Sequence, residues 1–162
     1  MNEESSLLAL ERRMIGHGAA VVVVGLVAGF GLLFALLEQI AIWPIPALDV
    51  QLPGSVRGWQ SAHVGGLLNG VMVVAFALTL RRLQLAERTA RWVALGFIYT
   101  AWANTVFYWF GNFAPNRGLS GGDTVHGEAT AAGLIAYLPA ATATVVTIAC
   151  ALAVTRAAFA AR

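Results

Sequence analysis

The chain has 162 residues, of which 59% are hydrophobic and 11% are charged, and its mean hydropathy is +0.73. A soluble domain usually carries about 25% charged residues, so this composition excludes an ordinary soluble protein and favours a membrane protein. The single cysteine, Cys150, excludes an internal disulfide, and the ten arginines form no basic stretch of the kind that binds nucleic acid.

Four apolar stretches are each long enough to cross a hydrocarbon core, which requires about 20 helical residues. They cover residues 14–37, 60–80, 91–113 and 128–154. The connections 38–58 and 114–127 carry proline and glycine turn residues, whereas the connection 81–90 is short and charged. The sequence therefore predicts an all-α membrane protein, a four-transmembrane-helix bundle, with residues 1–162 in a single integral membrane domain.

The arginines are distributed unequally between the two ends of these spans. Eight lie at the end that carries both termini and the connection 81–90, and two, Arg57 and Arg117, lie at the other end. Cytoplasmic segments of membrane proteins carry an excess of Arg and Lys. The distribution therefore predicts that both termini are cytoplasmic and that the two long connections lie on the outer side.

Polar side chains inside the spans are the candidates for function, because they are costly in a bilayer. They are His17 in the first span, His63 and Asn69 in the second, and Thr100, Asn104, Tyr108 and Asn112 in the third. Residues four apart share one face of a helix, so the last four form a stripe. We expect Thr100 and Asn104 to form interhelical hydrogen bonds. Tyr108 and Asn112 lie toward the outer end, in the same layer as His63 and Asn69.

His63 has two interpretations, a hydrogen-bonded histidine at a helix interface or a metal ligand. Paired with His126 on the same side of the membrane, it would hold a six-coordinate electron-transfer haem, and alone it would hold a five-coordinate haem with an open position. The glycines near it, Gly65, Gly66 and Gly70, admit either a neighbouring helix or a flat cofactor. No acidic residue lies in the middle of a span, which disfavours a proton pump or ion transporter.

Three segments resemble styrene oxide isomerases, which are small bacterial integral membrane enzymes. The segments are ERRMIGHG at 11–18, LPGSVRGWQSAHVGGLLNG at 52–70 and WANTVFYWFGNFAPNRGL at 102–119. The resemblance extends from about Leu7 to Leu119, with the same spacing between the motifs, and fades through the fourth span.

The resemblance implies a homotrimer in the inner membrane of a bacterium, with haem b held between subunits. It implies isomerisation of an aryl epoxide such as styrene oxide to an aldehyde, with ferric iron as Lewis acid and no net redox change. By resemblance, His63 is the axial ligand of the haem iron, and Asn69 and Tyr108 are catalytic. Aromatic positions expected to line the substrate pocket are Trp59, Trp102 and Phe107. Thr100 departs from the family pattern, which has an acidic residue there, and His126 has no counterpart in it.

Three functions therefore stand as hypotheses. The first is the epoxide isomerase. The second is a membrane electron-transfer cytochrome b with His63 and His126 as its two haem ligands. The third is a structural or assembly protein that uses its glycine-rich helix faces for packing.

Overall fold

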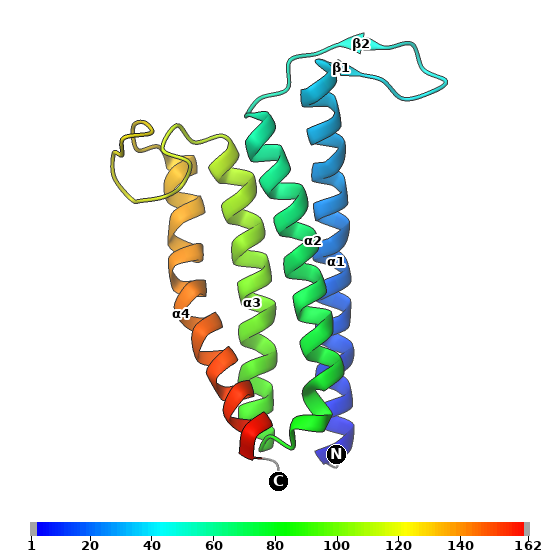
Figure 1. The fold of residues 1–162 in the computed structure, drawn as a ribbon, viewed down its shortest axis with the longest axis vertical. Coiled ribbons are helices and arrows are strands. Elements are labelled where there is room, and N and C mark those ends of the chain that lie inside the picture. The colour runs from blue at the N-terminus through cyan, green and yellow to red at the C-terminus, as the bar shows by residue number, and fades with distance from the viewer. Residues whose placement is uncertain (1–2, 161–162) are drawn as a thin grey trace.

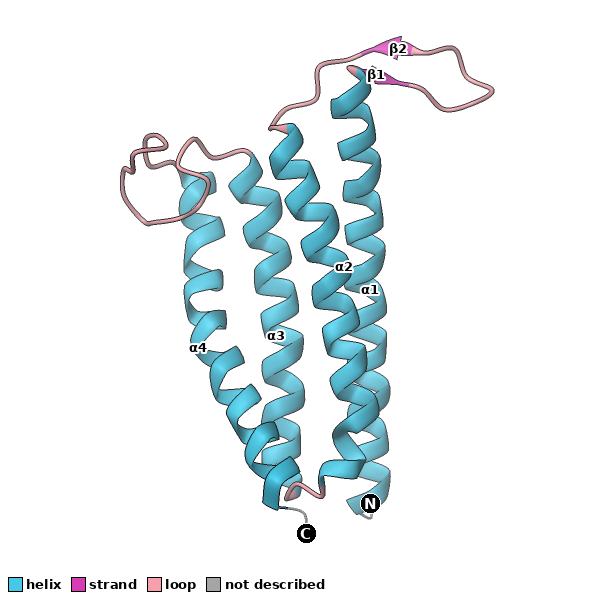
Figure 2. Cartoon of the chain, in the orientation of Figure 1, coloured by secondary structure: helices cyan, strands magenta, loops and turns pink. Residues whose placement is uncertain are grey.

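The computed structural model describes residues 3–160, and helices account for most of them. The helices are α1 (Glu3–Leu37), α2 (Val56–Thr79), α3 (Glu87–Asn112) and α4 (Ala131–Ala160), with a short 3-10 helix η1 (Leu80–Leu83) after α2. They run side by side along one axis (Figures 1 and 2). Helix α1 packs on α2, α3 packs on α4, and α3 also contacts both α1 and α2. The start of α1, the end of α4 and the α2–α3 connection lie at one end of the bundle (Figure 1).

Helix α1 begins at Glu3, although the apolar span was expected to begin at residue 14. Two polar residues before that span, Ser6 and Glu11, contact the rest of the bundle. The Glu11 carboxylate is nearly buried and lies 2.6 Å from Nε of Arg81, and the Ser6 hydroxyl donates to a Glu87 carboxylate oxygen at 2.6 Å. These two contacts hold the first turns of α1 against the α2–α3 end of the bundle, in a segment that hydropathy alone leaves outside the span.

Within residues 3–160, three helices are long and apolar enough to cross a membrane: Glu4–Leu37, Val56–Leu83 and Ala131–Ala160. Helix α3 is also long, but its polar stripe and its aromatic residues lower its hydropathy. It contacts all three other helices, so it exposes less apolar surface than they do. The fold is thus an all-α bundle with three helices that are candidate membrane spans. That α3 also crosses the membrane, and that both termini are cytoplasmic, remain predictions.

Two short strands follow α1 and were not expected from the sequence. Strands β1 (Gln39–Ile40) and β2 (Leu48–Asp49) pair antiparallel, with Gln39 opposite Asp49, and the Gln39 amide donates to the Asp49 carboxylate at 2.9 Å. The connection between them exposes large apolar side chains, of which Trp43 is 92% exposed. This hairpin extends beyond the end of α1 (Figure 1).

Helices α1 and α2 approach closely because glycines face each other at their contact. A Cβ atom on Gly66 would lie 2.7 Å from the Cα atom of Gly25, and a Cβ atom on Gly18 would lie 2.8 Å from the Gly70 carbonyl oxygen. Contacts of this kind allow helices to pack by van der Waals attraction in a membrane. The backbone of α1 therefore has little freedom to move away from a side chain added to α2.

We expect Gly66→Ala to destabilise the protein by about 1–3 kcal/mol, because the new methyl group meets backbone atoms that cannot rotate away. Thermal unfolding in one detergent measures the effect. Gly16→Ala is the matched control, since it lies in α1 with nothing within 4 Å of its added methyl group and should gain the higher helix propensity of alanine. Equal midpoints for both variants would contradict the close α1–α2 contact.

Candidate functional site

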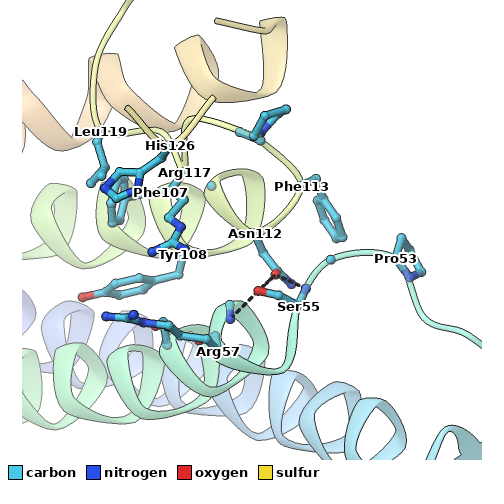
Figure 3. Close-up of a pocket in the computed structure, with 16 residues that line it drawn as sticks. Pro53, Ser55, Arg57, Phe107, Tyr108, Asn112, Phe113, Arg117, Leu119 and His126 are labelled. Carbon is cyan, nitrogen blue, oxygen red and sulfur yellow. Dashed lines mark hydrogen bonds between the residues drawn. The ribbon is translucent and has the colours of Figure 1, made fainter. Parts of the chain in front are cut away.

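A cavity of about 850 Å³ lies at the end of the bundle that carries the connections 38–58 and 114–127. It is enclosed by the start of α2, the end of α3 and the chain that follows α3 (Figure 3). Its walls combine apolar and polar side chains. The apolar ones include Phe107, Phe113 and Leu119, and the polar or charged ones include Arg57, Tyr108, Asn112, Arg117 and His126. Both expected outer residues of the α3 stripe, Tyr108 and Asn112, thus lie in one cavity.

Asn112 joins the end of α3 to the start of α2. Its side-chain oxygen accepts from the backbone N–H of Ser55 at 2.8 Å, and the Ser55 hydroxyl caps α2 by accepting from the N–H of Gly58 at 3.0 Å (Figure 3). Gly54 and Gly58 leave the space that the Asn112 side chain occupies. The other atom of this amide, Nδ2, is buried and has no hydrogen-bond partner within residues 3–160. Asn112 therefore carries one buried hydrogen-bond donor that nothing in the described residues satisfies.

Tyr108 is positioned by a glycine of the neighbouring helix. Its ring fills the space beside Gly65, where a Cβ atom would collide with the ring carbons, and it packs edge-on against Phe107 with centroids 5.5 Å apart. The phenol oxygen has no hydrogen-bond partner in the described part of the chain. Tyr108 therefore presents an available hydroxyl group to the cavity beside an aromatic wall.

Asn69 lies below this cavity in the contact between α2 and α3. Its amide donates to the Gly65 carbonyl at 2.7 Å, and its oxygen accepts from Asn104 at 2.8 Å. Thr100 similarly shares a hydrogen bond of 2.8 Å with Thr147 of α4. The interhelical hydrogen bonds predicted for Thr100 and Asn104 are therefore confirmed. Asn69 is buried between α2 and α3 and does not line the cavity.

His63 faces α1 rather than the cavity. Its Nδ1 atom lies 2.9 Å from the Gly25 carbonyl oxygen, and the absence of a side chain at Gly29 makes room for the ring. A carbonyl oxygen only accepts, so Nδ1 carries the proton and Nε2 carries a lone pair. Metal-ligating histidines commonly donate their other N–H to a backbone carbonyl in this way. His63 therefore has the hydrogen-bond partner that a ligand of haem iron would have, and its Nε2 atom would bind the iron.

His63 and Tyr108 lie on different sides of α2 within one copy of the chain. His63 and Gly66 contact α1, whereas Gly65 and Asn69 contact α3. His63 and Asn69 are six residues apart, which places them about 120° apart around the helix axis and agrees with these contacts. One copy of the chain thus does not bring the candidate ligand and the candidate catalytic hydroxyl together.

Of the three aromatic residues predicted to line a substrate pocket, Trp59 and Trp102 do not line this cavity. Trp59 donates to the Pro53 carbonyl at 3.1 Å and packs edge-on against Trp109, with centroids 5.5 Å apart. Trp102 donates to Nδ1 of His17 at 3.1 Å. Phe107 does line the cavity.

His126 also lines the cavity, but no contact within residues 3–160 joins it to His63. Across that part of the chain, no group of three or more His, Cys, Asp and Glu side chains is placed to hold a metal ion.

Arg57 and Arg117 predict only the orientation of the chain when the sequence is taken alone, yet both line the cavity. Their signal was already present, because they are the two arginines at the end of the spans that also carries Tyr108 and Asn112. Ser55 was missed because a helix-capping serine in a proline- and glycine-containing connection has no distinctive motif. Its position depends on Asn112, 57 residues later in the chain.

The fold and the cavity define a small all-α protein with helices apolar enough to cross a membrane and an aromatic cavity at one end of the bundle. The sequence matches the styrene oxide isomerase family over residues 10–159. It is 40% identical over 134 residues to the styrene-oxide isomerase of Pseudomonas fluorescens, covering 83% of this chain and 79% of that protein. The chain belongs to the styrene oxide isomerase family. The match includes α4, beyond Leu119, where the motif resemblance ended.

Proposed function

We propose that the protein is a haem b-dependent membrane isomerase that converts styrene oxide and related aryl epoxides to aldehydes, giving phenylacetaldehyde from styrene oxide. The observation that carries this proposal is the hydrogen bond from His63 Nδ1 to the Gly25 carbonyl, which leaves Nε2 available to iron. Membership of the isomerase family supports the reaction, since the relative from Pseudomonas fluorescens is named a styrene-oxide isomerase.

When bound, ferric haem would supply a Lewis acid that withdraws electron density from the epoxide oxygen. Tyr108 donates a hydrogen bond to that oxygen as it gains negative charge, because its hydroxyl is otherwise unpaired in the described chain. Phe107 excludes water while the benzylic C–O bond opens and a hydride shifts to the benzylic carbon, so that the cation becomes an aldehyde rather than a diol. The atoms of epoxide and aldehyde balance, and no external electron donor is needed.

Asn69 supports the site through its bonds in the α2–α3 contact. Its oxygen holds Asn104, and its amide holds the Gly65 carbonyl directly beside the Tyr108 ring. We assign it the role of orienting the substrate-facing wall.

We propose that the protein works as a homotrimer in the inner membrane of a bacterium. The separation of His63 from Tyr108 on two sides of α2 supports a cofactor shared between copies, since one copy then supplies the ligand and its neighbour supplies the hydroxyl. Large apolar side chains exposed on the helices, such as Phe30 and Val145, supply surface for lipid and for neighbouring copies.

Absorption spectra and turnover of the purified full-length protein test this function. We expect a Soret band from protein expressed with sufficient haem, and conversion of styrene oxide to phenylacetaldehyde without an electron donor, measured by gas chromatography. Protein denatured by heat is the control for spontaneous rearrangement. A low-spin six-coordinate spectrum that is lost in His126→Ala would instead identify the electron-transfer cytochrome. A protein with no chromophore and no turnover would identify the structural alternative.

A further inference from the structure

The cavity carries positive charge that nothing in the described chain neutralises. Arg57 and Arg117 both line it, and no Asp or Glu is among its lining residues in that part of the molecule. The ion pair between side chains in residues 3–160 joins Arg81 to Glu11, at the opposite end of the bundle. Arg57 and Arg117 are exposed and have no anionic partner in the described chain, so both guanidinium groups are free to pair with an anionic ligand.

Both arginines are placed by ordered backbone rather than by a free loop. Arg57 lies in the first turn of α2, whose positive dipole end adds to its charge. Arg117 lies in a turn closed by its N–H bond to the Ala114 carbonyl at 2.9 Å. Beside it, the fully buried Asn116 accepts from the N–H of Gly118 and donates to the carbonyls of two later residues.

The side chains reach the same part of the cavity from different segments. In Figure 3 the guanidinium groups of Arg57 and Arg117 extend toward the Tyr108 ring from opposite sides. Phe107 and Leu119 add apolar surface around them. The site therefore combines two planar cations with a wall that suits an apolar molecule, and arginine binds carboxylates through paired hydrogen bonds.

We propose that Arg57 and Arg117 form a carboxylate-binding subsite for a ligand with an apolar body. Carboxylates of this chemistry come from two sources, the propionate groups of haem or a free arylcarboxylate. The proposal rests on the proposed function only for the first source. Arg57 lies six residues before His63 on α2, toward the outer end of the helix, so a carboxylate bound there would lie outward of the iron ligand.

The first arm of the test titrates full-length protein, prepared without haem, with protohaem IX and with its dimethyl ester, which lacks the two charges. The Soret band reports binding. We expect wild type to bind protohaem at least tenfold more tightly than the ester, and the double variant Arg57→Met, Arg117→Met to lose this preference. Arg156→Met removes an exposed arginine at the other end of the bundle and should keep the preference.

The second arm measures binding of phenylacetate and of uncharged 2-phenylethanol to the same preparations by calorimetry. A preference for phenylacetate that the double variant loses would assign the subsite to a free arylcarboxylate. Circular dichroism and size-exclusion chromatography check that the variants fold. If neither carboxylate is preferred, or if both preferences survive in the double variant, the subsite does not exist. A wild type that binds no haem would overturn the proposed cofactor, whereas a double variant that keeps the preference for protohaem and keeps turnover would overturn only the propionate assignment.

Discussion

His63→Ala is expected to lose the haem absorbance and the isomerase turnover together. The imidazole Nε2 is the proposed bond to iron, and alanine offers no substitute donor. Turnover should fall to the level of the protein-free reaction. The measurement is haem content per protein, from the pyridine haemochrome spectrum, alongside product formation from styrene oxide.

His126→Ala is the matched control for this result. His126 is exposed and lines the cavity, so its removal should leave haem content unchanged if a single histidine holds the iron. Haem and turnover that both survive in His63→Ala would show that His63 is only a hydrogen-bonded residue of the α1–α2 interface. Loss of haem from both variants would favour the two-histidine cytochrome.

Tyr108→Phe should lower turnover by about 10²–10³-fold while the haem is retained. Removal of one hydrogen-bond donor to a developing oxyanion typically costs that much, and phenylalanine keeps the ring that fills the space beside Gly65. The comparison requires kcat and haem content from the same preparation.

Tyr99→Phe provides the control on the same helix. Its hydroxyl shares a hydrogen bond with Thr142 of α4, away from the cavity, so turnover should stay near the wild-type value. A Tyr108→Phe variant as active as wild type would remove Tyr108 from catalysis. Loss of haem in that variant would assign Tyr108 to cofactor binding.

The sequence predicted the helices well because an apolar stretch of about 20 residues is a signal that each segment carries on its own. The extension of α1 to Glu3 depends on Arg81 and Glu87, distant in sequence, and hydropathy has no access to such contacts. The β1–β2 hairpin was not predicted, because strands of two residues each are too short to show a periodic pattern in the sequence.

The site was predicted in part, because helical spacing determines which residues share a face but not which neighbour that face meets. The spacing of Tyr108 and Asn112 correctly placed them together. Trp102 lies six residues before Tyr108, about 120° away around α3, and meets His17 instead of the cavity. Arg57 and Arg117 come from two segments whose approach is fixed by the bond between Ser55 and Asn112.

In the proposed haem protein, the hydrogen bond between His63 and Gly25 would make α1 a determinant of redox behaviour as well as of packing. A histidine that donates to a carbonyl is a stronger electron donor to its metal. In an α-helix the same carbonyl also accepts from the N–H of Gly29, so the two donors share its lone pairs. A Cβ atom added at Gly29 would lie 2.8 Å from Nδ1 of His63 and would displace the ring, so a substitution there would change the reduction potential of the iron without contacting the substrate.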